Sequence, residues 1–267
     1  MRLTIVGASG SFAGPDSPAS CYLVRAEANG RTYSVVFDLG NGALGALQRY
    51  VSPWELDALF LTHLHPDHCV DCTGLYVYRK YDPAPRTAVA QPLPVHGPAG
   101  TQARLAAAYE GIDGAGMTGE FAFVTVTEGA AWRVGPITVT AFAVNHPVEA
   151  YGYRVEADGA VLAYTGDTDS CPALASLGRD ADLMLADCAF VDGRDTAPGV
   201  HLSGGRAAQA ALEAGARRLM LTHIPAWSDP ELCRAQAAEL WPGEVELARA
   251  GATYEIVPAE AAAAPGA

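Results

Sequence analysis

The sequence predicts an α/β fold of four layers, in which two β-sheets pack face to face and helices cover their outer sides. Two runs of strand-like segments, each followed by helices, are the first observation behind this prediction. The second is that apolar strands repeatedly end in histidine or aspartate, so several strands deliver such side chains to one edge. No linker and no internal repeat divides the 267 residues. We therefore expect a single domain over residues 1–258, followed by a disordered tail over residues 259–267.

The first run of strands starts at the N-terminus. Its expected elements are strands over residues 2–7, 21–24 and 33–37, a short helix over 44–50 and a buried strand over 58–61. Asn29-Gly30 suits the hairpin turn between the second and third strands. The Gly-, Ser- and Pro-rich residues 7–18 predict a connecting loop in preference to a phosphate-binding one, because they lack the GxxxxGKS/T pattern.

Less regular sequence connects the two runs. It is expected to contain a helix over residues 69–81, a short strand over 93–96, a helix over 100–109 and a Gly-rich loop over 111–119. The first of these helices carries several tyrosines. We interpret them as packing residues, with stacking against a nucleobase as the alternative.

The second run consists of strands, then of strands alternating with helices. The expected strands cover residues 121–127, 137–144, 151–156, 161–164, 183–186, 218–221 and 253–257, and the expected helices cover 204–214 and 230–240. The alternating part is typical of strands that pair in parallel, with helices on the face of their sheet.

The six residues from His63 to His68, HLHPDH, carry the densest chemistry in the chain. In extended chain, side chains two apart point the same way, so His63 and His65 can converge on one point. Pro66 suits the first turn of a helix, which directs Asp67 and His68 elsewhere. Burying four such groups without a cation would cost several kcal/mol. Two convergent pairs therefore predict two metal ions, since imidazole and carboxylate are ligands that borderline divalent metals accept.

Further candidate ligands also follow predicted strands. His146, Asp167 and His223 each come just past a strand end, as His63 does. Asp38 ends another strand before two glycines, where it could cap a helix or orient a metal-bound histidine.

Composition limits the classes of partner. The net charge is −13, which argues against a broad nucleic-acid surface. No apolar run approaches the about 20 residues that a membrane span needs, and the N-terminus does not resemble a signal peptide. We therefore expect a cytoplasmic protein without a membrane partner.

Two kinds of residue are left without an assigned role. The six cysteines are expected to be reduced in a chain of this size. Cys69 and Cys72 form a CxxC pair, but a zinc ribbon needs a second pair, which is absent. His96 is the one histidine without polar neighbours in its predicted setting.

The order of these motifs resembles that of the metallo-β-lactamase-fold hydrolases. The resemblance rests on HxHxDH at 63–68, His146, GDT at 166–168 and LTH at 221–223, and runs from Leu3 to about Val257. It implies the four-layer αββα sandwich and an enzyme with two divalent metal ions, which we take to be zinc, with manganese or iron as alternatives. The implied ligands are His63, His65 and His146 for one ion, Asp67, His68 and His223 for the other, and Asp167 as the bridge between them. The resemblance also favours the orienting role for Asp38.

Within that group, residues 185–190 and 201–211 are similar to motifs of the ribonuclease Z branch. The similarity implies that His201 acts on the phosphate and the leaving group, supported by Asp187. Asp67 is expected to take part in catalysis as well as in metal binding. The sequence departs from the branch where Asp187 stands for the commoner glutamate and where Leu202-Ser203 replaces Ser-Thr. The alternative is that His201 is an exposed loop residue capping the helix that begins near Ser203.

The substrate is expected to be a small phosphodiester. Only 20 residues separate His146 from Asp167, which leaves no room there for the arm that grips transfer RNA in ribonuclease Z. Residues 10–20, 43–49 and 221–227 resemble an actinobacterial subgroup of cyclic-nucleotide phosphodiesterases. That resemblance implies hydrolysis of cyclic AMP and related 3′,5′-cyclic nucleotides by a hydroxide held between the two metals, and a homodimer.

Other functions stay open at this stage. The metals alone would also suit a lactonase or another ester hydrolase, although the pair Asp187 and His201 would then have no role. Transfer-RNA 3′-end cleavage is the second alternative. A metal-binding module without enzymatic activity is disfavoured, because seven ligands form a complete set for two ions.

Overall fold

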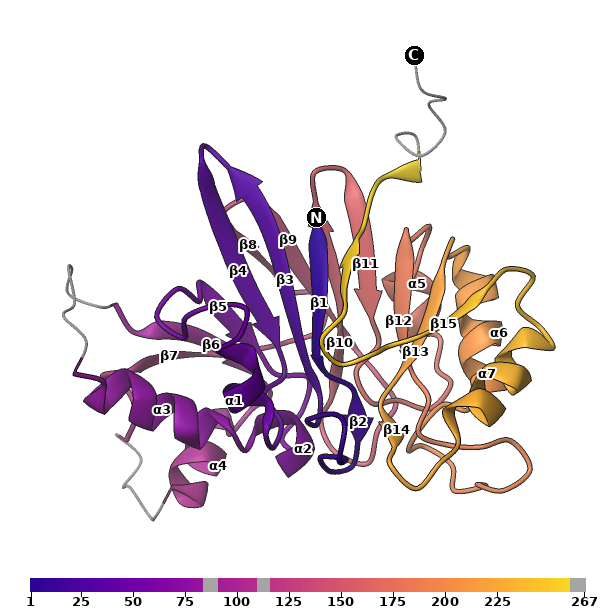
Figure 1. Cartoon of the computed structure of the whole chain (residues 1–267), viewed down its shortest axis with the longest axis horizontal. Helices are drawn as coiled ribbons and strands as arrows, with labels where there is room; N and C mark the ends of the chain where they lie inside the picture. The colour runs from indigo at the N-terminus through magenta and orange to yellow at the C-terminus, as the bar shows by residue number, and fades with distance from the viewer. Residues whose placement is uncertain (84–90, 110–115, 260–267) are drawn as a thin grey trace.

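The computed structural model describes residues 1–83, 91–109 and 116–259 of the chain. Two seven-stranded sheets pack face to face, and helices lie on the outer side of each (Figure 1). This arrangement confirms the predicted four-layer α/β sandwich. Most of the Gly-rich loop predicted over 111–119, and the predicted tail beyond residue 259, lie outside the described residues.

The first sheet contains strands from both ends of the chain. In spatial order its members are β16 (Thr253–Glu255), β1 (Arg2–Gly7), β3 (Cys21–Ala28), β4 (Arg31–Phe37), β5 (Ala58–Phe60), β6 (Leu93–Gly97) and β7 (Phe121–Thr125). The strands from β16 to β4 pair antiparallel, whereas those from β4 to β7 pair in parallel. The predicted hairpin is present, with Asn29 and Gly30 at positive φ in its turn.

The second sheet is similarly mixed. In spatial order its members are β15 (Val245–Leu247), β13 (Leu219–Thr222), β12 (Leu183–Asp187), β11 (Ala160–Tyr164), β10 (Tyr151–Ala157), β9 (Ile137–Ala143) and β8 (Ala131–Val134). β12 and β13 are buried at every position, as expected for parallel strands covered on both faces. β9 alternates between buried and less buried residues, as expected of an antiparallel strand near an edge.

Seven described helices complete the outer layers. α1 (Ala43–Leu47), α3 (Cys72–Tyr81) and α4 (Thr101–Ala108) lie outside the first sheet, α2 (Pro66–Cys69) lies at its lower edge in Figure 1, and α5 (Ala173–Leu177), α6 (Gly204–Ala214) and α7 (Pro230–Ala238) lie outside the second. α6 begins where the hydroxyl of Ser203 accepts the amide of Arg206 and ends at Gly215 in the left-handed conformation.

Three apolar clusters separate the four layers. The central one joins the inner faces of the two sheets and includes Tyr22, Phe37 and Tyr153, all almost fully buried. The other two lie between each sheet and its helices. A short ladder of β2 (Ser9–Gly10) and β14 (Ile224–Pro225) links the two halves at the edge where the candidate ligands gather (Figure 1).

Several elements differ from the sequence prediction. β8, α5 and β15 were not predicted, and the strand expected over 121–127 belongs to the first sheet, where β7 pairs with β6. The last strand also joins the first sheet, beside β1. The helix expected over 69–81 is interrupted before α3, because the side chain of Asp71 accepts the amide of Leu44 and its own amide donates to Leu39.

Candidate metal centre

The candidate ligands meet at one edge because the strands before them end there. β9 and β11 run in the same direction, since both are antiparallel to β10, and β11, β12 and β13 are parallel. The carboxyl ends of these strands carry His146, Asp167, Asp187 and His223. In the facing sheet, β5 delivers His63 to the same place.

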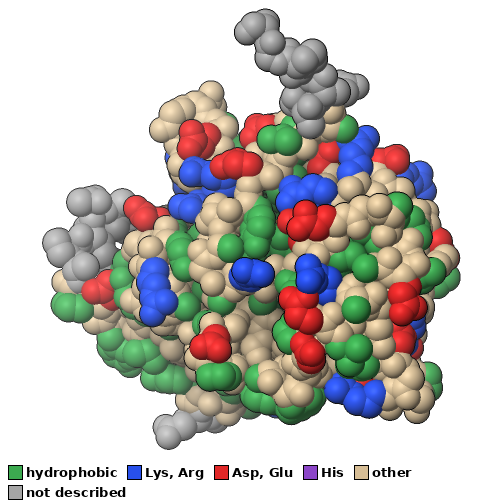
Figure 2. All heavy atoms as spheres, turned by 45° about the vertical axis from the view of Figure 1, so that its right-hand side comes forward, with side chains coloured by type: hydrophobic (Ala, Val, Ile, Leu, Met, Phe, Trp, Pro, Cys, Tyr) green, Lys and Arg blue, Asp and Glu red, His purple; other side chains and the backbone are tan. Residues whose placement is uncertain are grey.

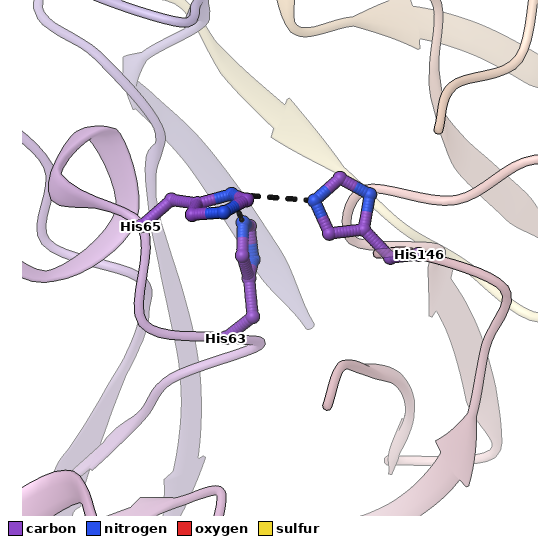
Figure 3. Close-up of side chains that lie close together, drawn as sticks. All are labelled: His63, His65 and His146. Carbon is purple, nitrogen blue, oxygen red and sulfur yellow. Dashed lines mark hydrogen bonds between the residues drawn. The ribbon is translucent and has the colours of Figure 1, made fainter. Parts of the chain in front are cut away.

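A first cluster consists of His63, His65 and His146, which the sequence predicted as the ligands of one ion. Nε2 of His63 lies 2.8 Å from Nδ1 of His65, and Nε2 of His146 lies 3.3 Å from that same atom. Figure 3 shows the three rings facing one another, with His146 approaching from the opposite sheet. Nδ1 of His146 is 2.8 Å from the carbonyl of Val200, which orients the ring.

A second cluster consists of Asp67, His68 and His223, predicted as the ligands of the other ion. Nε2 of His223 lies 3.1 Å from Nε2 of His68 and 3.1 Å from Oδ2 of Asp67. All three side chains are buried. α2 turns Asp67 and His68 away from His65, as Pro66 at its first position predicted.

Asp167 lies between the two clusters. One of its carboxylate oxygens, Oδ2, is 3.7 Å from Nε2 of His63, and the other, Oδ1, is 3.2 Å from Nε2 of His68. Oδ1 is buried and makes no hydrogen bond to any described residue. The position suits the predicted bridge, because the two carboxylate oxygens of Asp167 face nitrogens of different clusters.

The spacing of the ligand atoms fits metal binding. Ligands of a tetrahedral zinc ion at about 2.1 Å are separated by about 3.4 Å from one another. The separations reported within the two clusters run from 2.8 to 3.4 Å. In both clusters, imidazole nitrogens face one another, so that their lone pairs can converge on one cation. The residues present therefore fit two divalent cations, and the assignment of each ligand remains a prediction.

Asp38 orients one of these ligands. Its Oδ2 lies 2.8 Å from Nδ1 of His68 and accepts a 2.7 Å hydrogen bond from the hydroxyl of Tyr164. Thr62 donates to the other oxygen of Asp38 through its amide. Asp38 has a φ of 58°, an uncommon conformation for a residue other than glycine. Helix α1 is capped by Gly42 instead, so the capping alternative for Asp38 is wrong.

The electrostatics of the two clusters differ. Burial lowers the pKa of His63, His65 and His146, which favours their neutral, ligand-competent form. Burial also acts on His223, but the charge of Asp167 and the contacts with Asp187 and Asp67 outweigh it and raise the pKa to about 10. The pKa of His68 is raised in the same way, mainly by Asp167 and Asp38 after burial is overcome.

His201 and Asp187 form a pair beside the centre. Nδ1 of His201 lies 2.9 Å from Oδ2 of Asp187 and 4.0 Å from Oδ2 of Asp167. Burial disfavours the charged imidazole, but the charge of Asp187 and its hydrogen bond raise the pKa of His201 overall. Asp187 also accepts the amides of Thr168 and Ala189, which fix its position. The cap of α6 is Ser203, so the capping alternative for His201 is wrong.

Supporting residues around the centre were not predicted. Thr62, which contacts Asp38, stands directly before His63, and the carbonyl of Val200 stands directly before His201. Asp169 holds the loop that carries His201 by accepting the amide of Gly199 at 2.8 Å. Their position next to the motifs in the sequence could have singled these residues out. Their contacts could not be predicted, because each joins residues far apart in the chain.

The remaining histidine and the CxxC pair belong to neither ligand cluster. His96 is buried and stacks on Phe60, with centroids 4.2 Å apart, and burial lowers its pKa to about 4. Burial raises the pKa of Cys69 to about 11, and that of Cys72 is raised as well. Thiols held in the protonated form are poor nucleophiles and ligands.

On the face shown in Figure 2, acidic and basic side chains are interspersed. None of the described helices is long and apolar enough to cross a membrane.

Fold and site together define a metal-dependent hydrolase with an αββα sandwich. Residues 33–224 match the model of the beta-lactamase superfamily domain, and the chain belongs to this superfamily. Its relatives include one named a probable metallo-hydrolase and others named ribonucleases, which agrees with an enzyme of this kind.

Three relatives illustrate the range of similarity. The Mycobacterium leprae protein ML1173 is 40% identical over 96% of this chain and 89% of its own. The probable metallo-hydrolase YhfI of Bacillus subtilis is 28% identical over 96% of this chain and all of its own. Its crystal structure, described as a metallo-beta-lactamase fold protein, covers 95% of this chain and 99% of its own with a TM-score of 0.82 at 26% identity. Ribonuclease Z of Myxococcus xanthus is 26% identical over 96% of this chain and 98% of its own.

Proposed function

We propose that the protein is a dinuclear metal-dependent phosphodiesterase that hydrolyses 3′,5′-cyclic nucleotides such as cyclic AMP. The observation that carries the proposal is the pair of His201 and Asp187, 2.9 Å apart and next to Asp167. The ligand clusters alone would suit many hydrolases. An imidazole supported by a carboxylate beside them suits a reaction in which an alkoxide leaves phosphorus, because that oxygen needs a proton.

The residues of the centre would hold two divalent cations in the two clusters described above. When bound, such cations supply a water of lowered pKa and positive charge against the phosphoryl oxygens. Asp187 faces Nδ1 of His201, so that nitrogen carries its proton and Nε2 remains for the substrate. The charge of Asp187 favours the imidazolium, which can donate its Nε2 proton to the departing 3′-oxygen.

Two features favour a small substrate over an RNA. The segment between His146 and Asp167 is taken up by β10, β11 and a short turn, so no arm is inserted there. The net charge of −13 opposes binding of a long polyanion. Metal ions held among buried ligands can still bind one phosphodiester.

Transfer-RNA 3′-end cleavage is the second candidate, because several relatives are named ribonuclease Z or ribonuclease BN. The alignment with the Myxococcus ribonuclease Z runs over 311 positions, more than the length of this chain. That relative therefore carries segments that this chain lacks. A lactonase activity has no observation in its favour beyond the metal clusters.

A substrate panel separates these candidates. Purified protein is incubated with cyclic AMP, a lactone and a precursor transfer RNA, each with and without a chelator. We expect chelator-sensitive hydrolysis of cyclic AMP and little or no reaction with the other two. Cleavage of the transfer RNA at a rate above that of cyclic AMP would contradict the proposal.

Replacing His201 tests the catalytic pair itself. His201→Ala should lower turnover of cyclic AMP about 10²- to 10⁴-fold, the usual contribution of a positioned acid. Its metal content, measured by mass spectrometry of the digested protein, should be unchanged because His201 is not among the predicted ligands. Unchanged turnover in this variant would reject the role of His201.

A further inference from the structure

Two exposed aromatic side chains, Phe12 and Trp227, contact one another beside the metal centre and have no part in the chemistry proposed above. Their ring centroids are 4.9 Å apart, with 42° between the ring planes. Phe12 is 37% exposed and Trp227 is 66% exposed. Large aromatic side chains are usually used to bury apolar surface, so an exposed pair at a reaction site indicates a surface for a ligand.

The loops that carry the two rings are fastened to His223. β2 pairs with β14, the strand that directly follows His223. The backbone nitrogen of Ser11 lies 3.4 Å from Nε2 of His223, and Phe12 is the next residue. Trp227 follows β14 by two residues. Both rings therefore stand at the side of the second ligand cluster.

The rings are presented by tight turns. Ser11 has a φ of 64°, and the amide of Phe12 donates a 2.8 Å hydrogen bond to the carbonyl of Gly10, which closes a γ-turn. A γ-turn with positive φ is rare and strained, and such strain clusters at ligand-binding sites. Trp227 lies within the turn over residues 225–228, which a 2.8 Å backbone hydrogen bond closes. Little conformational freedom of the backbone remains to be lost when a ligand binds.

We propose that Phe12 and Trp227 form a stacking platform for the base of the nucleotide substrate. The inference rests on the proposed phosphodiesterase function, because one ribose joins the base to a phosphate held at the metal centre. The base then lies within reach of rings beside His223. Stacking requires no positive charge, which agrees with the acidic chain, and it accepts different bases because each has a π face.

The test compares a nucleotide with its base-free counterpart. KM and kcat are measured for cyclic AMP and for methyl ribofuranoside 3′,5′-cyclic phosphate, with wild type, Phe12→Ala, Trp227→Ala and the conservative Trp227→Phe. Each alanine variant should raise KM for cyclic AMP about 5- to 150-fold with kcat little changed. KM for the base-free substrate should stay as in wild type, and Trp227→Phe should restore most of the affinity. Leu240→Ala, which removes an exposed side chain beyond α7, serves as the control.

Binding of AMP, measured by calorimetry, keeps this test separate from the proposed activity. If AMP binding weakens in the alanine variants but no cyclic nucleotide is hydrolysed, the proposed function fails and the platform stands. Equal losses for both cyclic phosphates, or wild-type KM and AMP affinity in both variants, would overturn the platform. A change of oligomeric state in Trp227→Ala with KM unchanged would assign the two rings to contact with a second copy of the chain, which also overturns it.

Discussion

The two ligand clusters of the metal centre are built from different chemistry. The first consists of three imidazoles whose pKa burial lowers, and two of these side chains, His65 and His146, are only partly buried. The second is fully buried and combines Asp67 with two imidazoles of raised pKa, and the neighbouring Asp167 supplies the second carboxylate that pairs with them. Attraction between opposite charges therefore stabilises the second cluster even without metal. The first cluster brings together neutral imidazoles, whose facing lone pairs are stabilised only when a cation binds them.

Removing the carboxylate between the clusters should have the largest effect. Asp167→Ala takes a ligand from both sites, so we expect bound metal to fall well below two ions per chain. Turnover should fall by more than the about 10- to 100-fold that loss of a ligand-orienting residue costs. Metal analysis and kinetics check this together. A variant that remains fully loaded would contradict the bridging position of Asp167.

Removing one ligand from each cluster shows how much each cluster contributes to stability without metal. His146→Ala and Asp67→Ala should each lose one ion. In chelator, however, Asp67→Ala should be less stable than wild type by about 1–3 kcal/mol, because it removes one of the carboxylates that pair with the buried charges of His68 and His223. His146→Ala removes a partly buried neutral ring and should cost much less. Urea unfolding of both variants measures this, and equal losses of stability would show that the clusters do not differ as described.

Asp38→Asn should weaken metal binding at the second cluster without removing a ligand. The amide keeps the shape of the carboxylate but removes the charge that faces Nδ1 of His68. Affinity for the ion of the second cluster should fall about 10- to 100-fold, with the first cluster unaffected. Titration against a competing chelator resolves the two sites. Equal weakening at both sites would mean that Asp38 supports the fold and not one ligand.

His96 is a buried imidazole outside both clusters, so its pKa shows the effect of burial alone. Its folded pKa of about 4 lies below the ordinary value of 6.5, so the unfolded chain binds the proton more tightly. The free energy of unfolding therefore decreases as the pH falls from 6.5 towards 4, and we expect it to fall by about 2 kcal/mol between pH 7 and pH 5. His96→Phe keeps a ring stacked on Phe60 but cannot bind a proton. Its free energy of unfolding should therefore fall by about 2 kcal/mol less than that of wild type over the same pH range. An identical pH profile in urea unfolding of wild type and variant would contradict it.

The sequence predicted the fold class and the candidate ligands because both depend on local patterns. Each ligand follows a short apolar strand, and parallel strands bring their carboxyl ends together. All seven predicted ligands meet in the structure, together with His201 and Asp187. The identity of the metal does not follow from imidazole and carboxylate ligands, which suit several divalent ions.

Features that depend on pairing across the chain were not predictable in the same way. β16 pairs with β1 although some 250 residues separate them, and no local pattern signals that partner. β8, α5 and β15 are only three to five residues long, too short for a hydrophobic period to show. The contact of Phe12 with Trp227 likewise depends on the pairing of β2 with β14.

The central claim is that the two clusters hold two cations on either side of Asp167. Anomalous diffraction at the absorption edge of the bound metal tests it most directly, in crystals of the protein as purified and after saturation with zinc. The account predicts two peaks, one among His63, His65 and His146 and one among Asp67, His68 and His223. A single peak, or none after saturation, would contradict it.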